Sequence, residues 1–131
     1  MPSKVIPGLK YTKEHEWARI EGEHATIGIT DHAQAQLGDV VYVEIPGAGG
    51  ELTQNKTFGV VESVKAVSDL FAPLSGTVVE ANERPVNTPE LLNQDPYGNA
   101  WLIKIKIKNT SEVGELLDAS AYESYLAEIS K

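Results

Sequence analysis

Short runs of β-branched and other apolar residues recur along most of this 131-residue chain, and most of them end at glycine, proline or acidic turn residues. Such spacing is typical of proteins built mainly from short strands. The run at 103–108 alternates isoleucine with lysine, so one face of that strand should be buried and the other solvated. Because the strands do not alternate with long helices, a parallel nucleotide-binding sheet is not expected. The expected strands are 15–20, 24–29, 39–46, 56–63, 67–73, 76–82 and 100–108.

Three segments change to helical spacing. Residues 30–38 predict a short helix in the N-terminal half of the chain, and residues 88–96 predict a single helical turn between prolines. The candidate caps of the first helix are Thr30 or Asp31 at its start and Gly38 at its end. Near the C-terminus, Ser120 can cap an amphipathic helix. Its buried stripe should consist of Tyr122, Tyr125, Leu126 and Ile129.

Charge and composition restrict the partners of the chain. It has 19 acidic and 11 basic residues, and the resulting charge of −8 opposes binding to nucleic acid or to an anionic membrane. The absence of cysteine excludes disulfides and thiol catalysis and favours an intracellular setting. No apolar run is as long as a membrane span, and the first ten residues lack the apolar core of a signal peptide. We therefore expect a single cytoplasmic domain over residues 1–131.

Motifs for phosphate binding and for nucleophilic hydrolysis are absent from the sequence. His15, His24 and His32 lack the spacing of metal ligands, so each is interpreted as a surface or hydrogen-bonding residue. We expect no metal, no catalytic residue and no enzymatic activity of the chain by itself.

A lysine interrupts the valine-rich segment GVVESVKAVSD at 59–69, with no glycine, proline or asparagine within four residues of it. Lys65 has three interpretations. It is a solvated residue of a continuous strand, or it protects an edge strand from aggregation. Alternatively, a type I turn at 63–66 displays it at a hairpin tip. In that case Val64 is exposed beside it, which suits a surface that another protein recognises.

The segment GVVESVKAVSDLFAPLSGTVVEAN resembles the lipoyl-attachment region of the glycine cleavage system H protein family. Four more segments resemble that family in the same order: KYTKEHEWARI, ATIGITDHAQAQLGDVVYVEIP, PELLNQDPYGNAWLIKIK and LLDASAYESYL. The resemblance covers about residues 9–127, and the E-S-V-K-A signature separates it from generic lipoyl domains and from biotin carriers. Ala100 departs from the glycine that usually precedes the tryptophan in this family.

The resemblance implies a fold and a modification. The fold is a sandwich of short antiparallel strands, of the lipoyl/biotinyl barrel-sandwich hybrid type, in one lipoyl-carrier domain. Lys65 matches the lysine that carries lipoic acid through an amide bond. A lipoate ligase or octanoyltransferase would recognise the attachment turn, whose other residues are Glu62, Ser63, Val64 and Ala66.

The resemblance also implies a non-catalytic carrier. Members of the family shuttle an aminomethyl group from glycine decarboxylase (P protein) to aminomethyltransferase (T protein), and reducing equivalents to dihydrolipoyl dehydrogenase (L protein). Two acidic residues of the cleft that receives the loaded arm match Glu16 and Asp69, and Glu14 is a further candidate. Two alternatives stay open: an H-like protein that donates or relays lipoyl groups to other enzymes, and a biotinyl carrier.

Overall fold

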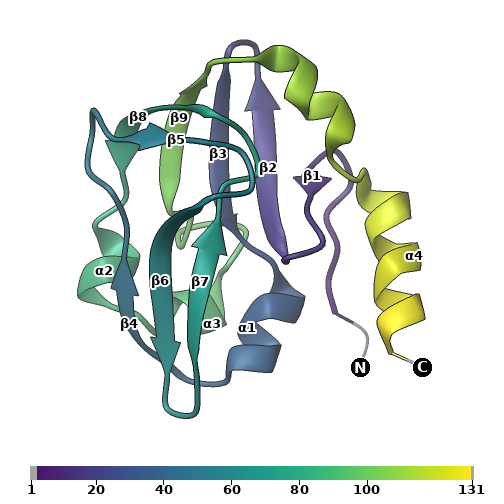
Figure 1. Cartoon of the computed structure of the whole chain (residues 1–131). Helices are drawn as coiled ribbons and strands as arrows, with labels where there is room; N and C mark the ends of the chain where they lie inside the picture. Colours follow the sequence, from purple (N-terminus) through teal and green to yellow (C-terminus); the bar gives the residue numbers. More distant parts are fainter. Residues whose placement is uncertain (1–2, 131) are drawn as a thin grey trace.

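The computed structural model describes residues 3–130, which form two antiparallel sheets (Figure 1). The larger sheet is open and has the strand order β1-β2-β3-β9-β8-β5. Its strands are β1 (Lys10–Tyr11), β2 (Glu16–Glu21), β3 (His24–Ile29), β9 (Ile103–Ile107), β8 (Gly76–Ala81) and β5 (Glu51–Leu52). The smaller sheet has the order β4-β6-β7, with β4 (Val40–Glu44), β6 (Thr57–Ser63) and β7 (Val67–Phe71).

Apolar side chains from both sheets meet in a shared buried cluster. Ile29 of the larger sheet packs in a buried cluster with Val43, Val61 and Leu70 of the smaller sheet. A second cluster fills the space against β8 and β9, and Phe58 contacts both clusters. This packing confirms the expected sandwich of short antiparallel strands.

The lysine–isoleucine alternation of β9 has the expected consequence. Ile103, Ile105 and Ile107 are buried, whereas Lys106 is exposed and Lys104 is half-buried. The lysines therefore form the outer face of the strand, as the period-two pattern predicts.

Helix α1 (Asp31–Leu37) begins and ends where the sequence predicts. Of the two candidate caps, Thr30 is the one used, because its hydroxyl accepts a hydrogen bond from the backbone N–H of Ala33 at 3.2 Å. Gly38 ends the helix with a φ of 77°, a conformation that favours glycine. The sequence therefore fixes this helix at both ends.

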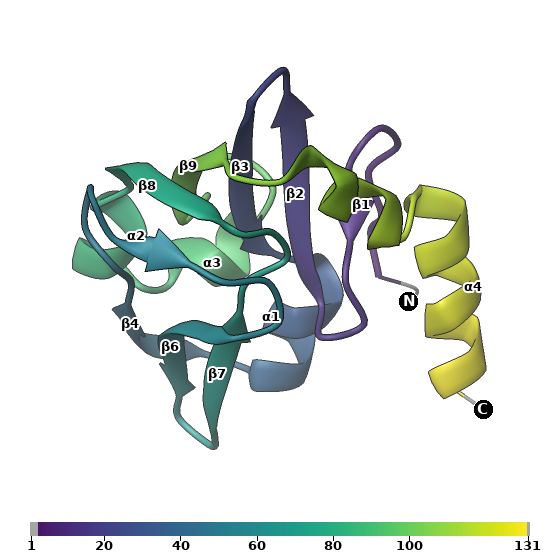
Figure 2. The same cartoon turned by 45° about the horizontal axis from the view of Figure 1, so that its top comes forward.

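Helix α4 (Ala119–Ile129) lies at one side of the molecule, beside β1 (Figure 2). Its N-cap is Asp118, whose carboxylate accepts from the backbone N–H of Ala121, so the prediction of Ser120 was wrong. Tyr122 is buried and stacks on Tyr11, with ring centroids 4.4 Å apart. Ile129 is exposed, so the predicted stripe loses its last member at the helix end.

Several short elements differ from the sequence prediction. Helix α3 (Leu91–Gln94) confirms the expected turn between prolines. The predictions missed α2 (Arg84–Asn87), the 3-10 helix η1 (Thr110–Glu115), and the strands β1 and β5. These strands have two residues each, too few for a period to be visible. Among the described residues, no helix has the length and apolarity needed to cross a bilayer.

Candidate functional site

The segment around Lys65 is a hairpin turn between β6 and β7, and not a continuous strand. The backbone N–H of Ser63 donates to the carbonyl of Ala66 at 2.8 Å. The Ser63 hydroxyl accepts from the N–H groups of Ala66 at 3.0 Å and Lys65 at 3.3 Å. A serine that bonds to the backbone two and three residues ahead stabilises a turn without glycine. Lys65 therefore lies at the tip of the hairpin.

Two contacts from the preceding loop hold this tip. The backbone N–H of Val64 donates to the carbonyl of Asp39 at 3.0 Å, which ties the tip to the loop before β4. The Lys65 side chain passes Gly38, where an added Cβ would lie 3.3 Å from Cε of the lysine. Gly38 thus ends α1 and also leaves room for the lysine. The residue beside the lysine, Val64, has 70% of its surface exposed.

Glu16 is at the start of β2 and only 2% exposed. Its carboxylate accepts from the Thr12 hydroxyl at 2.6 Å and from the backbone N–H of Phe71 at 3.2 Å. Burial disfavours the ionised form and raises the pKa of Glu16 to about 7, although these two hydrogen bonds act in the opposite direction. Glu16 can therefore exchange a proton near neutral pH.

The turn before β2 brings three consecutive side chains to one place. Thr12 organises it, because its hydroxyl also accepts from the backbone N–H groups of Glu14 at 3.2 Å and Glu16 at 3.1 Å. His15 has a φ of 70°, which is uncommon for a residue with a side chain. In a regular strand successive side chains point to opposite faces. Here Glu14, His15 and Glu16 all line the same cavity.

This cavity, which we call the acidic cleft, has a volume of about 270 Å³ and lies between the start of β2, α1 and β7. Three carboxylates line it, those of Glu14, Glu16 and Asp69. Glu14 and Asp69 are exposed, whereas Glu16 is buried. Apolar residues complete the wall, among them Ile29, Leu37, Val61 and Leu70. The cleft can therefore accommodate a chain that is apolar along its length and cationic at its end.

The cleft and the hairpin tip are adjacent. Ala66 and Val67, the two residues that follow Lys65, belong to the wall of the cleft. A chain attached to Lys65 would therefore begin next to the cleft. The structure thus places Glu14 and Glu16 on the same cavity as Asp69 and the residues that follow Lys65, although the two segments are far apart in the sequence.

Sequence reasoning missed Thr12, and it interpreted His15 only as a surface or hydrogen-bonding residue, of which the structure confirms the hydrogen bond. The His15 Nδ1 lies 2.8 Å from the hydroxyl of Tyr122, which in turn lies 2.9 Å from the hydroxyl of Thr30. Burial, with the neighbouring His32 as a smaller cause, lowers the pKa of His15 to about 4, so the ring is neutral at neutral pH. No residue pattern indicates a left-handed backbone at this position, so the sequence alone offered no signal for it.

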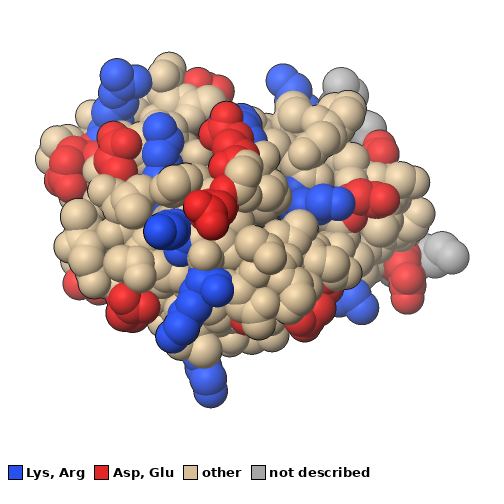
Figure 3. All heavy atoms as spheres, turned by 90° about the horizontal axis from the view of Figure 1, so that it is seen from above, with Lys and Arg blue, Asp and Glu red and all other residues tan. Residues whose placement is uncertain are grey.

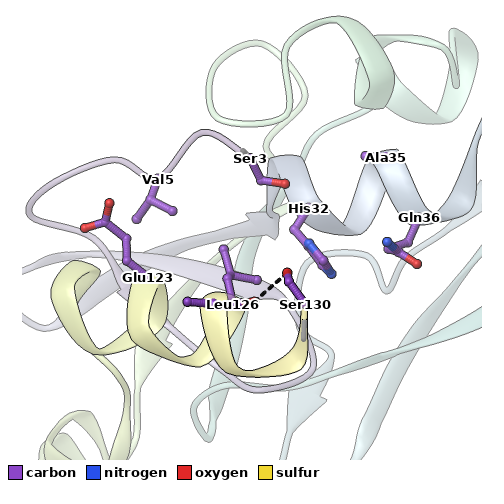
Figure 4. Close-up of a pocket in the computed structure, with 9 residues that line it drawn as sticks. Ser3, Val5, His32, Ala35, Gln36, Glu123, Leu126 and Ser130 are labelled. Atoms are coloured by element: carbon purple, nitrogen blue, oxygen red, sulfur yellow. Dashed lines mark hydrogen bonds between the residues drawn. The ribbon is translucent and has the colours of Figure 1, made fainter. Parts of the chain in front are cut away.

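A larger cavity, of about 430 Å³, lies between α1, α4 and the N-terminal segment (Figure 4). Its lining includes His32, Glu123 and Leu126, and in Figure 4 the Ser130 hydroxyl donates to the Leu126 carbonyl. None of the acidic residues of the cleft lines it. Within residues 3–130 no three histidine or acidic side chains gather in a way that could hold a metal ion.

Comparison with known proteins gives consistent results. The family model for glycine cleavage H-protein matches residues 9–129. The chain is 58% identical over 126 residues to the glycine cleavage system H protein of Symbiobacterium thermophilum, with 96% of this chain and 98% of the relative covered. It is 54% identical over 125 residues to that of Carboxydothermus hydrogenoformans, with 95% and 96% covered. The crystal structure of a glycine cleavage system H protein from Mycobacterium marinum matches with a TM-score of 0.84 and 40% identity, over 96% of this chain and all of that one.

Proposed function

This chain belongs to the glycine cleavage H-protein family, and on that premise we propose that it carries a lipoyl group on Lys65 and serves as the mobile carrier of the glycine cleavage system. The observation that carries the assignment of Lys65 is its place at a braced hairpin tip beside the acidic cleft. An exposed amine on a well-ordered turn is accessible to an enzyme that acylates it. Acylation converts a cationic ammonium group into a neutral amide.

The surroundings of Lys65 fit such a group. Among the described residues the lysine takes part in no salt bridge, so its acylation breaks none. The apolar wall of the cleft suits the alkyl chain of a lipoyl arm. When bound, the lipoyl group supplies a dithiol–disulfide couple that accepts the aminomethyl group and electrons. Every other contribution comes from the residues of the chain.

We assign to Glu16 and Asp69 the binding of the cationic amine at the end of the loaded arm. A carboxylate accepts a charge-assisted hydrogen bond from such an amine, and that bond is stronger where water is excluded. Glu16 is buried, and its two hydrogen bonds fix the orientation of its carboxylate. Glu14 and Asp69 are exposed and line the same cleft, so their negative charges attract the cationic amine toward the opening of the cleft. The chain thus holds and shields the cargo and catalyses no step.

The partners in this proposal are the P protein, which loads the arm, the T protein, which unloads it, and the L protein, which reoxidises it. A lipoate ligase or octanoyltransferase attaches the group. In this proposal the tether keeps the cargo at a high effective concentration at each client enzyme. The shared requirement is that every enzyme reaches the same hairpin tip or the arm that extends from it.

The test is intact mass spectrometry after expression with lipoate. The wild-type protein should gain one lipoyl group, and Lys65→Arg should gain none while its circular dichroism stays unchanged. Lys56→Arg, at another exposed lysine just before β6, is the matched control and should be modified like the wild type. A lipoyl group on the Lys65→Arg variant would overturn the assignment.

A further inference from the structure

The surface around the hairpin tip is unusually apolar. Among residues 3–130, six large apolar side chains are exposed. Four of them surround the tip: Val41 and Tyr42 on β4, Val64 in the turn, and Val67 on β7. The other two, Val79 and Ile129, lie on different elements. We call the group of four the tip patch.

A bulge in β4 creates half of the tip patch. The pairing of β4 with β6 shifts between Val40 and Tyr42, and both Val41 and Tyr42 are exposed. In a regular strand one of two neighbouring side chains would point into the core. Bulges re-aim side chains in this way and occur next to functional sites. Sequence alternation alone could not place both residues outside.

The strand register continues the patch across the small sheet. Tyr42 is opposite Glu62, and Glu62 is opposite Val67, so these three side chains project from the same face. In Figure 1 the three strands lie side by side and the hairpin tip projects beyond them. Tyr42 and Val67 therefore flank Glu62 on one face of the sheet, next to the turn that carries Val64 and Lys65.

Acidic residues outnumber basic ones on the three strands of the small sheet and in the hairpin turn. The strands of the small sheet carry Glu44, Glu62 and Asp69, and Lys65 is the only cation in residues 40–44 and 57–71. By contrast, basic and acidic side chains are interspersed on the face shown in Figure 3. A surface on which exposed apolar side chains lie beside acidic ones is complementary to a partner with an apolar pocket and a basic rim.

We propose that the tip patch is the docking surface for the enzyme that attaches the lipoyl group, and that this enzyme covers Val41, Tyr42 and Val67 with an apolar pocket rimmed by basic side chains. This inference rests on the proposed function, because it takes Lys65 as the attachment site. We choose this enzyme because of the short distance between the lysine amine and the protein surface. The lysine amine ends a four-carbon stem, so an enzyme that acts on it must cover the surface at the base of that stem.

The client enzymes act at the far end of the finished arm. The arm adds the whole lipoyl chain to the lysine stem, so these enzymes can engage the reactive end without covering β4. The acylating enzyme, by contrast, acts before the arm is present and must bind close to the surface around Lys65. The tip patch should therefore control attachment far more than any later step.

The test variant is the double change Val41→Thr and Tyr42→Thr, which leaves the turn and Lys65 intact. Threonine is β-branched and suits a strand, and it reduces the apolar surface at both positions. The control is Val79→Thr, because Val79 is 48% exposed, close to the 53% of Val41, and lies on the other sheet. A purified lipoate ligase with lipoate and ATP is used to measure initial rates over a range of carrier concentrations.

We expect kcat/KM of the double variant to fall about tenfold or more, as for loss of central contacts in other interfaces. The fall should come through a higher KM, while the Val79→Thr control matches the wild type. Val67→Thr, a nearly isosteric change at a residue that is 70% exposed, should show a smaller rise in KM in the same direction. Glu44→Gln should weaken the dependence of the attachment rate on salt.

Two results would overturn the inference. The first is a double variant that is modified as efficiently as the wild type, or whose kcat alone falls. The second is a rise in KM for the P, T or L protein with no change for the ligase, which would assign the patch to a client. If the wild-type protein is not modified at Lys65, the proposed function fails instead, so the two failures are distinguishable.

Discussion

Replacement of Glu16 by glutamine tests whether the acidic cleft contains a carboxylate that opposes folding. Glu16 is buried, and its pKa rises from an ordinary value of 4.5 to about 7. A carboxyl group with a raised pKa binds its proton more tightly in the folded state than in the unfolded state. The free energy of unfolding should therefore fall as the pH rises from about 4.5 to about 7, and should then stay low.

The magnitude follows from the pKa. A difference of one in pKa corresponds to about 1.4 kcal/mol, so the ionised form of Glu16 destabilises the fold by about 3 kcal/mol above pH 7. Glutamine cannot ionise and so lacks this pH dependence. The Thr12 hydroxyl and the N–H of Phe71 bond to different oxygens of Glu16, and glutamine has only one oxygen. One of these hydrogen bonds is therefore lost in the variant, which costs about 1 kcal/mol at every pH. As the pH rises from 5 to 8, the free energy of unfolding of the variant should therefore increase by roughly 2–3 kcal/mol relative to that of the wild type.

Urea unfolding of the unmodified protein at several pH values gives this difference directly, provided that the m-values of the two proteins agree. Glu14→Gln is the matched control, because it removes the same charge from an exposed position two residues away. It should not reproduce the pH-dependent gain. A constant difference between Glu16→Gln and the wild type from pH 5 to pH 8 would refute the reasoning.

Three further predictions concern other parts of the structure. Asp118→Ala should destabilise the protein by about 1 kcal/mol through loss of the α4 cap, whereas Ser120→Ala should change its thermal midpoint little. Gly38→Ala should cost about 1–3 kcal/mol in urea unfolding, because alanine does not tolerate a φ of 77° and a ψ of −156°. Gly114→Ala is the control, because a Cβ added at Gly114 would meet no atom within 4 Å. Asp69→Asn should speed the release of amine from the loaded arm in the absence of T protein, and a rate equal to the wild type would remove Asp69 from the proposed site.

Much of the fold could be predicted from sequence because the relevant signals are local. The alternation at Ile103–Ile107 fixes which face of β9 is buried, and the caps of α1 fix its ends. Where two polar residues compete for the same helix start, propensity does not decide between them. Asp118 caps α4 because its backbone is extended there, with a ψ of 177°, whereas Ser120 already lies within the helix.

The candidate site was predictable in parts. The missing turn residues around Lys65 left three interpretations, and the hydrogen bonds of Ser63 select the hairpin tip. Glu16 and Asp69 were linked only by the family resemblance, because no local pattern brings together residues from β2 and β7. The left-handed backbone of His15 and the bulge at Val41 were invisible to sequence reasoning, because both break the alternation on which that reasoning depends.

The burial of Glu16 connects the stability of the fold to the cargo in the proposed function. An unpaired carboxylate in this position destabilises the folded protein above neutral pH, and a bound cation supplies the missing partner. The amine of the loaded arm would thus lower the pKa of Glu16, and its binding would release a proton near pH 7. Because the two hydrogen bonds to Glu16 are already formed, its carboxylate needs little reorientation to receive the amine. The burial of Glu16 therefore has two effects. It opposes folding of the empty carrier, and it makes binding of the amine in the cleft more favourable.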